Sequence, residues 1–230
     1  MQAKEEAFSQ IFGQPTSAFP ASCITEPFRN ELDRSLFQAE IQIWRGCVVI
    51  YTEQGDRPDE EKLQYGDIIL FANGRRPSAH FKISTLLETE TDIVFHVLRM
   101  NLEVGNLASE RMIKSAIDAH SVKNPAFQRQ AGYDYVVVYA TKFKNANFGL
   151  GSLTTFKNKV YIVDLATDSA ASLSLRTGDC ILAVNETAVF EHLQFSVRLE
   201  ADLVHTPYVA IVIERPACDN AESLINKTIV

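Results

Sequence analysis

An internal repeat is the strongest constraint that this sequence places on its fold. Residues 66–88 (GDIILFANGRRPSAHFKISTLLE) and residues 178–200 (GDCILAVNETAVFEHLQFSVRLE) align without a gap at a constant offset of 178 − 66 = 112 residues. The identical pairs include Gly66 and Gly178, Asp67 and Asp179, Leu70 and Leu182, Asn73 and Asn185, His80 and His192, Ser84 and Ser196, Leu87 and Leu199, and Glu88 and Glu200. A domain duplication is the simplest cause, because a chain of 230 residues has room for two domains of about 100 residues each.

Each copy has the same order of predicted elements. A Gly-Asp turn leads into an apolar strand, then a turn, then a helix with apolar residues at spacings of three and four, then a last strand. In the second copy, three further strands (YVVVYATKF, SLTTF and VYIVDL) and a short helix starting at residues 168–171 come first. We therefore expect a mixed α+β, mostly β fold: two partly open antiparallel β-barrels, each with two helices, joined by a helical linker.

The composition argues against several classes of partner. The formal net charge is −7, the sequence pI is about 5.3, and lysine and arginine form no run, so nucleic acid and anionic membranes would be repelled. The apolar runs are far shorter than the ~20 residues of a membrane span, and MQAKEEAFSQ lacks a signal-peptide core. We expect a cytoplasmic protein with no direct membrane insertion. The four cysteines show no CxxC or CxxH spacing, so neither disulfides nor a metal site are expected.

Catalytic and cofactor signatures are missing from the sequence. The five histidines have no HExxH or serine-elbow context, and no nucleophile is paired with a base. The glycine-containing stretch NFGLGSL (147–153) lacks the third glycine of a dinucleotide fingerprint and the lysine of a phosphate-binding loop, and it leads into β-rich sequence. The sequence therefore predicts neither an enzyme nor a bound cofactor.

Residues 131–216 resemble a PDZ domain. NFGL at 147–150 fits the family's X-Φ-G-Φ carboxylate-binding loop, SAASLSLRTGDCILAVN resembles its short helix and following strand, and HLQFSVRLE resembles its groove-forming helix. Residues 20–100 resemble a second, more divergent copy. The resemblance implies a non-catalytic tandem adaptor or scaffold whose second domain binds the C-terminal tails of other proteins. In this family the tail adds as an extra strand beside the groove helix.

The resemblance assigns the ligand's terminal carboxylate to the loop that contains Asn147, Phe148, Gly149 and Leu150, which Gly151 and Ser152 follow. Glycine allows successive backbone N–H groups to turn inward as an anion-binding nest, and the two large apolar residues can form a pocket beneath it. A second register, GLGS at 149–152, would put Ser152 in place of the last apolar residue and make the pocket shallower. NFGL is the register we prefer.

The groove helix supplies the expected selectivity. His192 matches its first position, where the resemblance implies that the imidazole accepts a hydrogen bond from a serine or threonine two residues before the ligand terminus. The implied ligands are therefore Ser/Thr-x-Φ-COOH. Ser196 and Leu199, at i+4 and i+7 from His192, share its helix face and would line the groove. Either Lys142 or Lys144 could hold the carboxylate through water, and simple solvation of both lysines remains an alternative.

The first copy departs from this pattern at its loop. Between the candidate strands CITEPF (23–28) and LFQAEIQIW (36–44) lies RNELDRS (29–35), which has no glycine and carries Glu31 and Asp33. Acidic groups there would repel a carboxylate. We expect this copy to pack against the second or to dimerise. The alternative for the whole chain is a structural or regulatory assembly subunit that uses PDZ-like folds for dimerisation.

The remaining segments complete the expected domain organisation, with 1–19 as an N-terminal tail, 101–130 as a helical linker and 217–230 as a C-terminal tail. In the linker, NLASERMIKSAIDAHS (106–121) predicts a helix capped by Asn106. Its apolar stripe of Met112, Ile113, Ala116 and Ile117 needs a packing partner. The tail ends with Thr228 two residues before Val230, which makes it a possible self-ligand. Recruitment of another PDZ protein, or no role at all, stays open.

Overall fold

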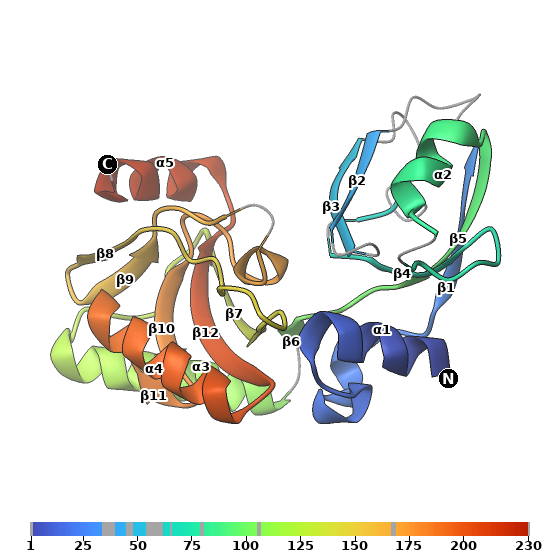
Figure 1. Ribbon diagram of the computed structural model, residues 1–230. Helices are drawn as coiled ribbons and strands as arrows, with labels where there is room; N and C mark the ends of the chain where they lie inside the picture. Colours follow the sequence, from blue (N-terminus) through green and yellow to red (C-terminus); the bar gives the residue numbers. More distant parts are fainter. Residues whose placement is uncertain are drawn as a thin grey trace. The chain divides into compact units, whose positions relative to one another are not determined.

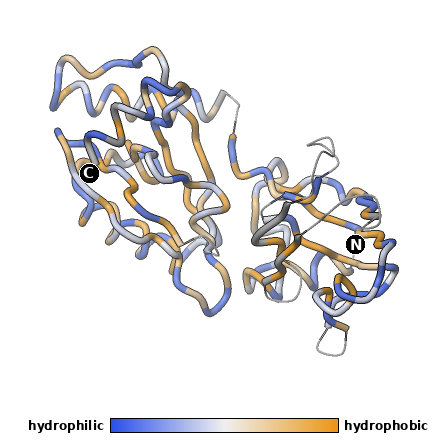
Figure 2. The backbone as a smooth tube through the Cα atoms, turned by 90° about the horizontal axis from the view of Figure 1, so that it is seen from above, coloured by the Kyte–Doolittle hydropathy of each residue, from blue (hydrophilic) through white to orange (hydrophobic). Residues whose placement is uncertain are grey.

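A computed structural model describes residues 2–33, 40–44, 48–53, 62–64, 66–78, 81–104, 107–166 and 169–229. The chain divides into two compact units, Met1–Asn101 and Leu102–Val230 (Figure 1). Each unit has its own antiparallel sheet and its own hydrophobic core. Hydrophobic residues are concentrated along the strands of both units, while most turns are hydrophilic (Figure 2).

The first unit begins with a helix and continues as an antiparallel sheet. Its elements are α1 (Gln2–Phe12), 3₁₀ turns at Thr16–Ala18 and Ala21–Cys23, β1 (Phe28–Asp33), β2 (Glu40–Trp44), β3 (Val48–Glu53), β4 (Ile68–Ala72), α2 (Ile83–Thr89) and β5 (Asp92–Leu98). The strand order is β1-β5-β4-β3-β2. In α2, Ile83 and Leu86 are buried, as the predicted helical spacing requires.

The second unit contains a larger sheet and three α-helices among its described residues. Its elements are β6 (Glu103–Val104), α3 (Leu107–Lys123), β7 (Tyr133–Thr141), β8 (Leu153–Phe156), β9 (Lys159–Ile162), a 3₁₀ turn at Ala171–Leu173, β10 (Cys180–Val184), β11 (Thr187–Ala188), α4 (His192–His205), β12 (Tyr208–Pro216) and α5 (Asp219–Ile229). The strand order is β6-β7-β12-β10-β9-β8, and β11 pairs with β10.

The two sheets repeat one topology. The order β1-β5-β4-β3-β2 in the first unit corresponds strand by strand to β7-β12-β10-β9-β8 in the second, with β6 added outside β7. Both sheets are open rather than closed into barrels, and helices and strands occupy similar shares of the described chain. The predicted mixed fold with antiparallel sheets is thus present in both units, in a less barrel-like form.

The sheet of the second unit is covered on both faces. One face packs in a core with buried Phe195, Leu199 and Leu203 of α4. The other face packs in a second core with Ile113 of α3 and Ile225 of α5. The unit therefore has helices on both sides of its sheet (Figure 1), and α4 is the helix on the side that carries the predicted groove.

Residues 1–19, predicted to be an N-terminal tail, contain a packed helix. Phe8, Ile11 and Phe12 of α1 are buried, and α1 packs against β4. Phe8, Phe12 and Phe19 form an aromatic cluster with ring centroids 5.1–5.4 Å apart. The helix is thus part of the first unit.

The strand predicted at CITEPF is wrong. Residues Ala21–Cys23 form a 3₁₀ turn, and β1 runs through most of the predicted loop. Buried Asn30 and Leu32 alternate with exposed Arg29 and Glu31, as expected for a strand. Because Asn30 is polar, the sequence does not show the alternation of apolar and polar residues that predicts a strand. Glu31 therefore lies on a strand paired with β5, and its carboxylate is 2.8 Å from Arg29. Residues 34–39 between β1 and β2, and also His80, lie outside the described residues.

The predicted linker helix and C-terminal tail both belong to the second unit. The stripe of α3 packs on the sheet through buried Ile113 and Ala116, while Asn106 lies outside the described residues. The tail forms α5, in which Ala221 and Ile225 are buried. Strand addition needs an extended peptide, and the backbone of Thr228 is helical here. Val230 lies outside the described residues, so self-recognition stays a prediction.

Candidate functional site

A groove of about 590 Å³ lies between α4 and the segment that leads into β8. Strand β8 is the edge strand of its sheet, so its outer backbone groups are available for pairing. The residues that line the groove are Lys142, Ala146, Asn147, Phe148, Gly149, Leu150, Gly151, Leu153, Ser196, Leu199, Glu200, Leu203 and Val204. An edge strand beside a helix, with a groove between them, is the arrangement in which an extended peptide can add to a sheet.

The core fixes the orientation of α4. Phe195, Leu199 and Leu203 recur at spacings of four and are buried in the sheet core, so this side of the helix faces the sheet. Ser196 and Glu200 follow them around the helix and line the groove. The spacing of the apolar residues thus places one hydroxyl group and one carboxylate of α4 along the groove.

In the loop that precedes β8, two neighbouring carbonyl groups accept hydrogen bonds from the segment that precedes and begins the 3₁₀ turn. The carbonyl of Phe148 accepts a hydrogen bond from the N–H of Ala171 (2.9 Å), and the carbonyl of Gly149 accepts one from Ala166 (3.0 Å). In a trans peptide the N–H points opposite to the preceding carbonyl. The N–H groups of Gly149 and Leu150 therefore point away from Ala166 and Ala171.

These amides have no acceptor within the part of the chain that the structure describes. None of its residues accepts a hydrogen bond from the N–H of Phe148, Gly149 or Leu150, whereas the N–H of Gly151 donates to the carbonyl of Asp164 at 3.0 Å. The N–H groups of Gly149 and Leu150 point to the same side of the loop, an arrangement that suits an anion. The contrast with Gly151 limits the amides without an acceptor in the described part of this loop to residues 148–150, the stretch in which the NFGL register predicts the carboxylate site.

Glycine is required at position 149 for two reasons. Its φ is +91°, in the region that L-residues rarely adopt, and a Cβ there would lie 2.0 Å from the Cβ of Ser169. Any side chain would therefore force the loop away from Ser169. The sequence predicts this glycine from its motif, but the contact with Ser169 is visible only in the folded chain.

The apolar wall of the groove is continuous with the core. Phe148, Leu150 and Leu153 are partly buried and pack against the sheet core that also contains Leu199. Phe148 and Leu150 therefore line the groove and also pack against the core. An apolar ligand side chain that entered here would be removed from water.

Two of the expected loop residues lie outside the groove lining. Lys142 lines the groove, but Lys144 is exposed elsewhere on the loop. Ser152 is exposed, and its carbonyl accepts hydrogen bonds from both Val163 (2.9 Å) and Asp164 (3.2 Å), a local irregularity at the start of β8. The geometry thus brings Asn147, Phe148, Gly149, Leu150, Gly151, Lys142, Ser196 and Leu199 together and leaves Lys144 and Ser152 apart.

His192 stands one helical turn before Ser196, beyond the lined part of the groove. Its backbone N–H donates to Oγ1 of Thr155 at 3.0 Å, and its Nδ1 is 3.1 Å from the same hydroxyl. Thr155 lies two residues after Leu153 on β8 and therefore on the same side of the strand. These contacts join β8 to the start of α4 at the end of the groove that is opposite to the loop.

Sequence reasoning missed several groove residues. Glu200 and Leu203 follow Ser196 and Leu199 by four positions, so helical periodicity could have found them. Leu153 and Thr155 share a face by strand periodicity, but only the folded chain shows that Thr155 reaches His192. Among the described residues, no group of three histidine, cysteine or acidic side chains could hold a metal ion. No helix in the described ranges is both long and apolar enough to cross a membrane.

These features define an open antiparallel sheet with a peptide-sized groove between its edge strand and a helix, as PDZ domains have. No family model and no curated protein matches the sequence. Among solved structures, the crystal structure of MUPP1 PDZ4 is 20% identical, covers 47% of this chain and 96% of its own, and has a TM-score of 0.33.

Two further similar structures contain INAD PDZ45. The complex with an NG2 peptide is 16% identical over 84% of this chain and 91% of its own, with a TM-score of 0.29. The complex with NORPA CC-PBM is 17% identical over 84% of this chain and 93% of its own, with a TM-score of 0.30. All three neighbours are PDZ structures, the family that the sequence resembles. At such TM-scores the likeness does not decide function, and the residues of the groove must do so.

Proposed function

We propose that the chain is a non-catalytic interaction adaptor whose second unit binds the C-terminal residues of other proteins as an extra strand on β8. This proposal is carried by the N–H groups of Phe148, Gly149 and Leu150, which find no acceptor among the described residues and lie at the end of an apolar groove. A terminal carboxylate supplies two oxygens with several lone pairs, which suits such a nest. An internal peptide segment has no such group.

The groove also suits the rest of a terminal peptide. The free edge of β8 offers main-chain hydrogen bonds, and the wall of Phe148, Leu150 and Leu199 favours an apolar last side chain. His192, at the far end, faces the place of an earlier ligand residue. We therefore infer ligands of the form Ser/Thr-x-Φ-COOH, with affinities in the micromolar range, roughly −7 to −8 kcal/mol.

The test is a titration of the full chain with labelled Ser/Thr-x-Φ peptides, for example the sequence AESLINKTIV, each with a free and with an amidated C-terminus. We expect saturable binding that weakens at least tenfold on amidation, because the nest loses its anion. Binding that is equal for both forms would overturn the carboxylate site.

A matched pair of variants on α4 locates the binding. Ser196→Trp places a large ring in the groove, whereas Val197→Trp changes the adjacent position, which is exposed and outside the groove lining. We expect the first variant to lose peptide binding and the second to keep it. If the folded chain binds no peptide of the panel, the assembly alternative gains support, and sedimentation velocity would then measure whether the chain dimerises.

A further inference from the structure

The hydroxyl of Thr155 contacts both the backbone N–H and the imidazole of His192. Oγ1 of Thr155 accepts the backbone N–H of His192 at 3.0 Å. That N–H belongs to the first residue of α4, whose N-cap Glu191 makes no side-chain capping bond. Thr155 thus satisfies, from a neighbouring strand, one of the donors that a helix N-terminus leaves unpaired.

A hydroxyl has one proton and two lone pairs. Since the peptide N–H is always a donor, it occupies a lone pair of the Thr155 oxygen, and the hydroxyl proton remains to be placed. Nδ1 of His192 is 3.1 Å from that oxygen, and no other partner of the Thr155 hydroxyl lies among the described residues. The N–H bond received at a helix N-terminus polarises the hydroxyl and makes it a better donor. The hydroxyl can therefore donate its remaining proton to Nδ1.

In a neutral imidazole one ring nitrogen accepts and the other carries the proton. We propose that Thr155 holds His192 in the tautomer with its proton on Nε2, so that the groove selects a hydrogen-bond acceptor two residues before the ligand terminus. This inference rests on the proposed function and deepens it. It also reverses the direction of the bond that the sequence resemblance implies, in which the imidazole accepts from the ligand hydroxyl.

Thr155 is in this proposal a positioning residue, because it acts on the ligand only through His192. Serine and threonine hydroxyls satisfy an Nε2–H donor because they also accept hydrogen bonds. An ether oxygen, which accepts but cannot donate, satisfies it equally. A ligand side chain that only donates, such as lysine, does not.

The direction of the bond is tested by two peptides that differ in one atom. At the position two before a C-terminal valine, one carries O-methylserine and the other norvaline, in which a methylene replaces the ether oxygen. In mildly alkaline buffer, where histidine side chains are mostly neutral, we expect the full chain to prefer the O-methylserine peptide by about fivefold, as for one net hydrogen bond. Equal affinity, or a preference for norvaline, overturns the assignment.

Variants separate positioning from a structural role. We expect Thr155→Val to abolish the preference while leaving the norvaline affinity within about twofold, and Thr155→Ser to keep the preference, because serine retains the hydroxyl. Thr154→Val, the same change at the adjacent strand position, is the matched control. The ring nitrogens of His192, followed by ¹⁵N NMR, should show a proton on Nε2 in the unaltered chain and a mixture of tautomers in Thr155→Val. A proton on Nδ1 in the unaltered chain overturns the proposal whatever the affinities are.

The outcomes also distinguish this inference from the proposed function. Amidation of the norvaline peptide tests only the carboxylate nest, because norvaline makes no polar contact with His192. Carboxylate-dependent binding without an ether preference overturns the role of Thr155 alone. If no free-carboxylate peptide binds, both proposals are overturned together.

Discussion

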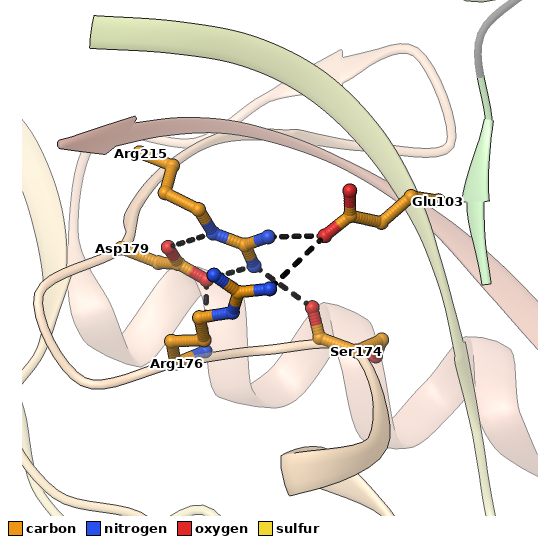
Figure 3. A network of polar contacts seen from close by, with 5 residues as sticks. All are labelled: Glu103, Ser174, Arg176, Asp179 and Arg215. Atoms are coloured by element: carbon orange, nitrogen blue, oxygen red, sulfur yellow. Dashed lines mark hydrogen bonds and ion pairs between the residues drawn. The ribbon is translucent and has the colours of Figure 1, made fainter. Parts of the chain in front are cut away.

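Arg215 and Asp179 form a bidentate ion pair inside the second unit, with Nε–Oδ1 at 2.7 Å and Nη2–Oδ2 at 2.8 Å (Figure 3). Nη2 of Arg215 also donates to the carbonyl of Ser174, and its other terminal nitrogen contacts Glu103 of β6. The first unit repeats this arrangement. Arg99 binds Asp67 through two bonds of 2.8 Å and donates to the carbonyl of Lys62. Arg215 lies on β12 and Arg99 directly follows β5, so each pair ties the repeated Gly-Asp turn to the end of the last strand of its unit, which explains why the aspartate is repeated.

Loss of Arg215 should be strongly destabilising. Asp179 is fully buried, so Arg215→Gln would leave a buried carboxylate without its charged partner, at a cost of about 3–5 kcal/mol. Arg99→Gln should cost less, because the Arg99 side chain is 24% exposed and water can reach the site. Urea unfolding followed by circular dichroism measures both. Arg129→Gln, which breaks an exposed pair with Glu110, is the control and should cost about 0–1 kcal/mol. A similar cost for Arg215→Gln and the control would contradict this account.

The repeated asparagine should matter through both its backbone and its side chain. Asn185 has φ 44°, its Oδ1 accepts the N–H of Ala210 at 3.0 Å, and its Nδ2 donates to Asp202 at 2.9 Å. Asn185→Ala loses these bonds and keeps the strain, so we expect a loss of about 2–3 kcal/mol in the free energy of unfolding. Asn185→Gly relieves the strain and should lose only about 1 kcal/mol. Equal losses in the two variants would show that the positive φ contributes little.

Much of the fold follows from residues whose role is local. Asn73 and Asn185, which align in the internal repeat, occupy equivalent turns. Like Asn185, Asn73 has a positive φ (47°), and its Oδ1 accepts the N–H of a residue on the last strand of its unit, Val94, at 2.8 Å. Lys157 and Asn158, between β8 and β9, both have positive φ, as residues of a tight turn do. Turn chemistry and periodicity therefore predict the elements of the second unit well.

The errors arise where tertiary contacts decide. Asn30 occupies an inward position of β1. Because this buried residue is polar, the sequence pattern does not predict a strand there. In the tail, Ala221 and Ile225, four residues apart, bury one side of a helix, while self-recognition through Thr228 stays a prediction. Neither Thr155 nor Ser169 carries a local signal, because their contacts with His192 and Gly149 exist only once distant segments meet.

The two lysines near the loop should differ in their effect on peptide affinity. Lys142 lines the groove, so Lys142→Gln removes a positive charge near the proposed carboxylate and should weaken peptide binding by about threefold to fivefold at low salt. Lys144→Gln makes the same change at an exposed position outside the groove and should have less than about a twofold effect. Fluorescence titration with one Ser/Thr-x-Φ peptide measures both. The reverse order would assign the carboxylate contact to Lys144.

Protonation of His120 should lower the free energy of unfolding of the second unit in mild acid. Burial lowers the pKa of His120, whose Nε2 is 3.0 Å from the carbonyl of Leu182, so the folded unit favours the neutral ring. As pH falls below the ordinary histidine pKa of about 6.5, the unfolded chain takes up a proton first, and stability is lost until the folded pKa is reached. We expect the free energy of unfolding to fall less between about pH 7 and pH 5 in His120→Gln, which keeps a donor for Leu182. Identical pH slopes in the two proteins would exclude this role.

The helix α5 should stabilise the second unit without affecting its groove. Ile225 is 4% exposed and packs in the core that contains α3, on the face of the sheet opposite to α4. Ile225→Ala should therefore cost about 2–3 kcal/mol in urea unfolding, near the lower end for a buried isoleucine because the helix is terminal. Ser223→Ala, an exposed position on the same helix, is the control and should have little effect. Peptide affinity should stay within about twofold in both variants. A marked loss of peptide affinity in Ile225→Ala would mean that the released tail competes with the peptide for the groove, as the self-ligand prediction requires.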